Sequence, residues 1–103
     1  MIKSILKGLK IELHDIYGDQ LKGLYLYGSY SRNDADNESD IDILIVLDKI
    51  ESYSGEIGRT SKLVSELSLK YDVTISRVFV SQQDWAEKET PFLLNARKEA
   101  IAA

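Results

Sequence analysis

The sequence predicts a small α/β domain in which helices pack on a mixed β-sheet of three or more strands. Two kinds of segment alternate along the 103 residues. Some have apolar residues every three or four positions, which is typical of amphipathic helices. Others are short β-branched runs, which are typical of buried strands. The length fits a single domain over residues 1–103, and 44% hydrophobic residues disfavour intrinsic disorder.

The first half of the chain is expected to contain one helix and two strands. Residues 1–17 carry Ile and Leu side chains at helical spacing. Residues 21–27 predict a short strand that Gly28 closes. Residues 32–39 are polar and acidic, which predicts a loop. Residues 41–47 are almost uninterrupted Ile, Leu and Val, so this strand should be central, with both faces of the sheet covered.

The second half continues the alternation. Residues 55–71 place apolar side chains on one helical face, and residues 73–80 predict a third strand. Ser81 is expected to cap a short helical turn that carries Trp85. A last helix is expected over residues 91–103, because a proline suits its first turn and the preceding threonine can cap it.

The composition excludes several classes of function. Cysteine is absent and the single histidine, His14, is expected at the surface, so disulfides, thiol catalysis and Cys- or multi-His metal sites are ruled out. The net charge of −4 makes nucleic acid unlikely as the main partner. A signal peptide is absent, and no apolar run approaches the roughly 20 residues of a membrane span. We therefore expect a cytoplasmic protein with no membrane partner.

Residues 28–42 carry the side chains that predict chemistry. Gly28 and Ser29 directly follow a strand, where backbone amides and a serine hydroxyl can point at an anion such as phosphate. Asp40 and Asp42 stand two apart at the start of the central strand, so their side chains share a face. Neighbouring carboxylates repel unless a cation lies between them, and Mg²⁺ takes carboxylate oxygens together with substrate phosphates. The two features predict a site for a Mg²⁺–nucleoside triphosphate.

A third carboxylate would complete a two-metal site, and Asp72 is the best candidate. It is expected to begin the third strand, and it can lie beside Asp40 and Asp42 if the two strands are neighbours. In such a site one ion lowers the pKa of the attacking hydroxyl, while the other holds the triphosphate and the leaving pyrophosphate. The alternative is that Asp72 is a strand-end or helix-end residue with no metal. Arg32 likewise either neutralises phosphate or pairs with the acidic loop.

Two plainer interpretations of the acidic segment compete with this hypothesis. Residues 34–42 could form an ordinary solvated loop, but they run into an apolar strand where Asp42 should be largely buried. A calcium loop starting at Asp34 needs glycine at its sixth position and glutamate at its twelfth. The chain has Ser39 and Ile45 there, so the calcium interpretation fails.

The pattern of residues 28–42 resembles the minimal nucleotidyltransferases, a small group within the DNA polymerase β-type nucleotidyltransferase superfamily. That group has Gly-Ser-aromatic-Ala/Ser-Arg-Gly, a short loop, and Ser-Asp-Ile/Leu-Asp at the head of an apolar strand. This chain reads Gly-Ser-Tyr-Ser-Arg from residue 28 and Ser-Asp-Ile-Asp from residue 39. It departs mildly at Asn33, where glycine is usual, since asparagine tolerates left-handed backbone geometry.

The resemblance implies a polymerase β-type core, ATP or another NTP as substrate, and Mg²⁺ as cofactor. It implies transfer of a nucleoside monophosphate, with AMP as the first choice, to an acceptor hydroxyl. It assigns catalysis and metal binding to Asp40, Asp42 and Asp72. It assigns nucleotide binding to Gly28, Ser29, Arg32 and Ser39.

The resemblance also implies a protein partner. Many minimal nucleotidyltransferases are encoded beside a HEPN-domain protein, and some act as antitoxins by adenylylating that HEPN toxin. Two functions stay open: an active nucleotidyltransferase, and a catalytically weak antitoxin or partner subunit that acts by binding. Because 103 residues leave no room for an acceptor-binding domain, the acceptor is expected to be presented by another chain, most simply a HEPN-type protein.

Overall fold

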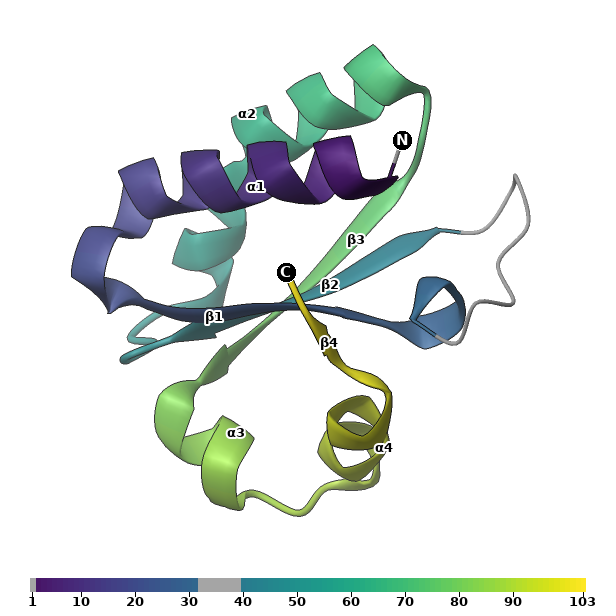
Figure 1. The fold of residues 1–103 in the computed structure, drawn as a ribbon. Coiled ribbons are helices and arrows are strands. Elements are labelled where there is room, and N and C mark those ends of the chain that lie inside the picture. Colours follow the sequence, from purple (N-terminus) through teal and green to yellow (C-terminus); the bar gives the residue numbers. More distant parts are fainter. Residues whose placement is uncertain (1, 32–39) are drawn as a thin grey trace.

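The computed structural model describes residues 2–31 and 40–103, which form a four-stranded mixed sheet between two layers of helices (Figure 1). The strand order is β3-β2-β1-β4. Helices α1 and α2 cover one face of the sheet, and α3 and α4 cover the other. The helices and strands are α1 (Ile2–Tyr17), β1 (Leu21–Tyr27), β2 (Ile41–Leu47), α2 (Tyr53–Tyr71), β3 (Ile75–Ser81), α3 (Gln82–Glu87), α4 (Pro91–Glu99) and β4 (Ile101–Ala102).

Strand β2 is central, as its apolar run predicts. It pairs antiparallel with β1 and parallel with β3. Side chains alternate between the two faces of a strand, so β2 contributes to two cores. Ile41, Ile43 and Ile45 are buried in the core that also contains α1 and α2 residues, while Leu44 and Val46 are buried with α4. The prediction of a mixed α/β fold with a covered central strand is confirmed.

The C-terminal residues correct the sequence-based prediction of a helix over 91–103. Helix α4 ends at Glu99, and Ala100 has an extended backbone. Ile101–Ala102 then form β4, which pairs antiparallel with β1, and the Ala103 N–H donates to the Leu24 carbonyl at 2.9 Å. The edge of β1 offers backbone hydrogen-bond partners, which a helical pattern in the sequence does not reveal. Pairing with β1 therefore makes this segment a strand instead of a helix.

Two predicted helix starts on the α3/α4 side are confirmed by their caps. The Ser81 side chain accepts a hydrogen bond from the Asp84 N–H at 3.1 Å, and the Thr90 side chain accepts one from the Leu93 N–H at 3.2 Å. Each bond satisfies an amide that the first turn of a helix leaves unpaired. The starts of α3 and α4 are therefore encoded locally.

Arg97 of α4 fastens the two short helices together. Its Nε donates to the Trp85 carbonyl at 2.6 Å, and its Nη2 donates to the carbonyls of Asp84 and Lys88. The guanidinium also lies over the Trp85 ring, 5.7 Å from the centroid. These contacts fix the direction in which α4 runs back towards β1.

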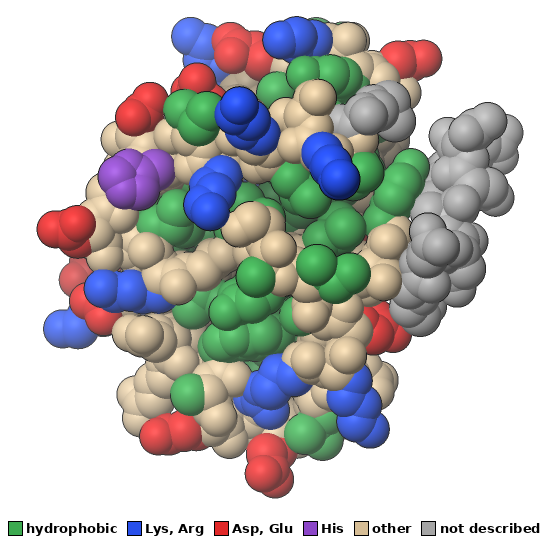
Figure 2. Space-filling model, in the orientation of Figure 1, with side chains coloured by type: hydrophobic (Ala, Val, Ile, Leu, Met, Phe, Trp, Pro, Cys, Tyr) green, Lys and Arg blue, Asp and Glu red, His purple; other side chains and the backbone are tan. Residues whose placement is uncertain are grey.

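One face of the molecule combines apolar and basic side chains. Figure 2 shows hydrophobic side chains gathered between α1 and β4, with Lys and Arg side chains around them. An apolar groove there is lined by Ile2, Leu6, Leu26 and Ile101, and by the aliphatic stems of lysines from α1. Over residues 2–31 and 40–103, no helix has the length and apolar character needed to cross a membrane.

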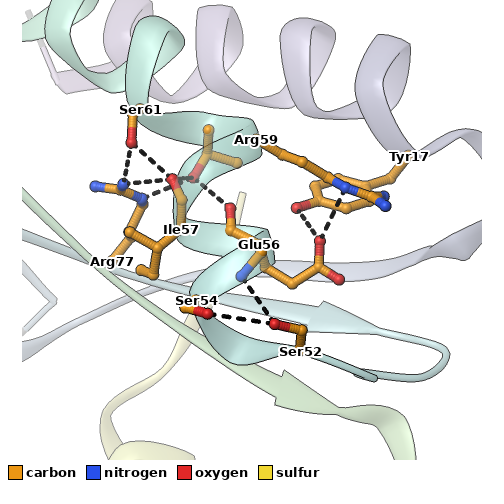
Figure 3. A network of polar contacts seen from close by, with 10 residues as sticks. Tyr17, Ser52, Ser54, Glu56, Ile57, Arg59, Ser61 and Arg77 are labelled. Carbon is orange, nitrogen blue, oxygen red and sulfur yellow. Dashed lines mark hydrogen bonds and ion pairs between the residues drawn. The ribbon is translucent and has the colours of Figure 1, made fainter.

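Arg77 connects β3 to α2 through three hydrogen bonds (Figure 3). Its Nε donates to the Thr60 Oγ1 at 2.7 Å, and its Nη2 donates to the Ile57 carbonyl at 2.9 Å and to the Ser61 Oγ at 3.3 Å. Thr60 is fully buried. This network holds the helix that covers the central strand.

We expect Arg77→Met to lower the free energy of unfolding by about 2 kcal/mol, because it removes several charge-assisted hydrogen bonds. Arg59→Met is the matched control. The Arg59 side chain is 61% exposed and makes one ion pair with Glu56 at 3.6 Å, which should contribute less than about 1 kcal/mol. Urea unfolding of both variants measures the difference, and equal losses would contradict a structural role for the Arg77 network.

Candidate nucleotide-binding site

The candidate site lies where β1 ends and β2 begins, on the face covered by α3 and α4. Asp42 shares that face with Leu44 and Val46 by strand alternation. Its neighbours in the sheet are Tyr27 on β1 and Ser76 on β3. Asp42 is half-buried, less than its position in an apolar strand predicts, and Asp40 just before the strand is exposed.

Gly28 brings the backbone directly against the Asp42 carboxylate. It has a φ of 75° and begins a short 3₁₀ turn over Gly28–Tyr30. A Cβ at this position would lie 2.5 Å from the Asp42 Oδ2, so the Asp42 carboxylate would have to move to admit a side chain. The Ser31 Oγ and N–H both donate to the Gly28 carbonyl, at 2.7 and 3.1 Å, and so hold the turn. The predicted need for glycine here therefore has two physical causes, the positive φ and the carboxylate.

Glu99 is a site residue that the sequence did not reveal. The Gly28 N–H donates to the Glu99 Oε2 at 3.1 Å, although the two residues are 71 positions apart. Gly28 thus lies between two acids, with its amide directed at Glu99 and its α-carbon against Asp42. No spacing rule connects Glu99 to the Gly-Ser turn. The contact requires α4 to run back to β1, which only the tertiary fold determines.

Tyr27 adds an aromatic group beside Asp42. Burial, followed by the negative charge of Asp42 and the neighbouring Tyr53, raises the pKa of the Tyr27 phenol to about 12. Its ring meets Phe92 of α4 edge-on, with 5.7 Å between the centroids. Phe92 is 43% exposed. The two rings form an aromatic surface next to the carboxylates.

The structure places Asp72 differently from the sequence-based prediction. Asp72 ends α2 in a left-handed conformation with a φ of 52°, and β3 begins only at Ile75. The expectation that Asp72 begins the third strand is therefore wrong. A left-handed residue at the end of a helix lets the chain turn sharply, and Asp is among the residues that tolerate it. The strand residue that lies opposite Asp42 is Ser76.

Other predicted site residues are described only in part. Arg32 and Ser39 lie outside the described residues. Ser29 lies in the turn that Gly28 begins, and only its backbone is described. Arg32 and Ser39 therefore remain predictions.

The acids that are described fit one part of the expected metal chemistry. Mg²⁺ is commonly held by one or two carboxylates together with substrate phosphates, and Asp40 and Asp42 are the acids that could serve this way. Within residues 2–31 and 40–103, no three acidic or histidine side chains gather closely enough to hold a metal ion. A site with a third protein carboxylate, such as Asp72, stays a prediction.

The chain belongs to the nucleotidyltransferase domain family, whose model matches residues 6–98. The resemblance drawn from the Gly-Ser turn and the paired aspartates is confirmed at the level of the family. The match extends over both helical layers and the first three strands of the sheet. The family assignment therefore rests on the domain as a whole as well as on the short motif.

Curated relatives share the family and are named for one reaction. A candidate protein adenylyltransferase of Methanocaldococcus jannaschii is 39% identical over 77 residues, which cover 75% of this chain and 77% of the relative. The protein adenylyltransferase MntA of Thermococcus cleftensis is 34% identical over 74 residues, which cover 72% of this chain and 73% of the relative.

Solved structures share the fold. A toxin–antitoxin structure with AMP-PNP has a TM-score of 0.63 at 20% identity, covering 90% of this chain and 68% of the other. A Shewanella oneidensis MNT antitoxin in complex with a tri-AMPylated HEPN toxin gives 0.60 at 18% identity, covering 99% of this chain and 71% of the other. At these identities the likeness supports the mixed α/β architecture.

We expect Gly28→Ala to abolish ATP binding, while Gly18→Ala leaves it intact. Both glycines have a positive φ, 75° and 55°, so both substitutions carry backbone strain of about 1–2 kcal/mol. Only at Gly28 would the new Cβ meet a carboxylate, because a Cβ at Gly18 has no heavy atom within 4 Å. Calorimetric titration with ATP and Mg²⁺ measures binding. Equal affinity in the two variants would show that phosphate does not use this turn.

Tyr27→Phe should weaken the loss of stability at alkaline pH. The Tyr27 pKa rises from 10.0 to about 12 on folding, so its stabilising effect is complete below pH 10 and disappears as the pH rises towards 12. Phenylalanine cannot ionise, so the variant lacks this effect. Urea midpoints at about pH 9 and about pH 11 measure it. The Tyr17 pKa is also raised, by burial and Glu56, so part of the dependence should persist in the variant.

Proposed function

We propose that this chain transfers AMP from Mg²⁺–ATP to a hydroxyl of a partner protein of the HEPN type. The observation that carries the proposal is the Gly28 turn packed against Asp42. This contact supports the proposal because it brings the backbone of the Gly-Ser turn next to a carboxylate that could hold Mg²⁺. The sequence-based expectation of a cytoplasmic protein fits a reaction that consumes ATP.

The site supports phosphate binding through backbone groups. The turn over Gly28–Tyr30 follows β1 directly, and turns of successive amides form concavities that bind anions. The lack of a side chain at Gly28 allows a ligand oxygen to approach the backbone. The acids Asp40 and Asp42 would hold Mg²⁺ together with phosphate oxygens. When bound, Mg²⁺ supplies positive charge that offsets the charge developing on the phosphates.

The proposed step is an in-line displacement at the α-phosphorus of ATP. The acceptor oxygen forms a bond to that phosphorus, while the bond from the phosphorus to the bridging oxygen breaks. Pyrophosphate leaves with the electron pair. The hydroxyl proton passes to a carboxylate or to water, and Asp40 is an exposed acid at the site. The role of the chain is mainly to position the groups and to stabilise charge.

The choice of AMP and of a protein acceptor is supported by the relatives. Those with 34–39% identity are named for protein adenylylation. One neighbour in fold was crystallised with AMP-PNP, and another was crystallised with an AMPylated HEPN toxin. A further neighbour carries glutamate in place of two aspartates that stand two positions apart, the same spacing as Asp40 and Asp42.

A second candidate is an antitoxin that acts by contact and transfers nucleotide weakly. The observation that favours it is the neighbour of Asp42 on β3, which is Ser76 rather than an acid. Described residues also show no cluster of three acids. A site with two carboxylates holds fewer metal ligands, which would slow the chemistry while leaving a binding surface intact.

The two functions separate in a labelling experiment. The chain is co-expressed with a candidate partner of the HEPN type, and the mixture is incubated with α-labelled ATP and Mg²⁺. We expect label on the partner with the wild-type chain and about 100-fold less with Asp42→Asn, since a carboxylate that would hold Mg²⁺ is lost. Glu89→Gln, at another exposed acid, is the matched control, and Asp72→Asn tests whether the exposed Asp72 also serves as a ligand.

Each result points to one conclusion. Label that survives Asp42→Asn would overturn this site as the catalyst. Neutralisation of the partner without any label would favour the contact-only antitoxin. Loss of label in Asp72→Asn as severe as in Asp42→Asn would establish a third carboxylate, which would then have to reach the site by a movement of the end of α2.

A further inference from the structure

Glu99 occupies the amide that a nucleotide phosphate would use. The Gly28 N–H donates to the Glu99 Oε2 at 3.1 Å. The Gly28 N–H can donate to an ionised carboxylate or to a phosphate, because both have negatively charged oxygens that accept charge-assisted hydrogen bonds. Glu99 and a phosphate at the Gly28 amide therefore compete.

The position of Glu99 in its helix indicates that the contact matters to the fold. Glu99 is the last residue of α4, and the C-terminus of a helix carries partial negative charge, which disfavours an acid there. Arg97 and Lys98 in the same turn have the charge that a helix end favours. The Gly28 amide provides the favourable partner that the helix end does not.

Several contacts hold Glu99 in place. Leu93 and Ala96 of α4 are buried against β2, and Arg97 fastens the helix to α3. After Glu99 the chain pairs with β1 as β4. The packing of α4 before Glu99 and the pairing of β4 after it therefore hold the Glu99 carboxylate next to Gly28.

The negative charges around Gly28 strengthen the competition between Glu99 and a phosphate. Gly28 already lies against the Asp42 carboxylate, so a second acid brings more negative charge to the same turn. A triphosphate that enters without a cation adds further like charge, which opposes binding. Removing the Glu99 carboxylate frees the amide and lowers this repulsion.

We propose that Glu99 is an internal competitor of the nucleotide, which holds the Gly28 turn when no nucleotide is bound and lowers the affinity for ATP. This inference rests on the proposed function, since it assumes that phosphate binds at Gly28. Nucleotide binding then requires the Glu99 side chain to leave the amide. Glu99 is the last residue of α4, and β4 begins two residues later. Movement of the Glu99 side chain away from Gly28 would therefore affect the junction between α4 and β4.

The test measures ATP affinity by calorimetry in EDTA, without metal. We expect Glu99→Ala to bind ATP about tenfold more tightly than the wild-type chain, because a competing like charge is removed. Glu89→Ala is the matched control. It makes the same change in net charge at an exposed residue, ten positions away and beyond the other end of α4. Glu99→Gln, which keeps the size of the side chain, should show a smaller gain and replaces Glu99→Ala if that variant does not fold.

The outcomes distinguish this inference from the proposed function. If Glu99→Ala binds ATP no more tightly than Glu89→Ala, or more weakly, the inference is overturned. If neither the wild-type chain nor any variant binds ATP with Mg²⁺, the proposed function itself fails.

Discussion

The contact between the Gly28 backbone and the Asp42 carboxylate organises the candidate site. It follows from the register of the sheet, in which Tyr27, the last residue of β1, lies opposite Asp42. The residue after Tyr27 must therefore turn away next to a carboxylate. Glycine is favoured here, because a Cβ would lie 2.5 Å from the Asp42 Oδ2 and displace that carboxylate, and because the φ of 75° is unfavourable for other residues. The strand pairing thus explains why a glycine and an aspartate, 14 positions apart in the sequence, act as one unit.

The same register determines on which face of the sheet the Asp42 side chain lies. Asp42 lies in the row of side chains that continues with Leu44 and Val46, and these two are buried under α4. A slip of one residue in the pairing would direct the Asp42 carboxylate into the apolar core formed by α1 and α2. Burying that charge among apolar side chains makes the slip unfavourable. Burial of the strand therefore maintains the position of a half-buried acid at its beginning.

The sequence predicted the parts of this protein that depend on local pattern. The bounds of the strands 21–27 and 41–47 agree with the structure, and the caps at Ser81 and Thr90 form as expected. These features depend on side-chain periodicity and on hydrogen bonds within three residues, so neighbouring residues are sufficient to specify them. The Gly-Ser turn and the paired acids were recognisable for the same reason.

The sequence did not predict the features that depend on distant partners. Strand β4 forms because β1 has a free edge, and Asp72 ends a helix because α2 continues to Tyr71 before the chain turns. Glu99 reaches Gly28 only because α4 runs back across the sheet. Acidic residues are frequent in the chain, with 17 Asp and Glu, so their type alone does not identify the one that closes the site. The tertiary path of the chain supplies that information.

Helix α4 lies beside the candidate site, and its position depends on residues outside the Gly-Ser and aspartate motif. Arg97 ties the helix to α3 through backbone carbonyls that include that of Trp85, and Phe92 at its start meets Tyr27 edge-on. Glu99 at its end meets the Gly28 amide. The two ends of α4 thus contact consecutive residues of the chain, Tyr27 and Gly28, on either side of the point where β1 becomes the turn. A shift of α4 would move an aromatic ring and a carboxylate together, so the packing of α3 and α4 determines which groups of α4 lie beside Tyr27 and Gly28.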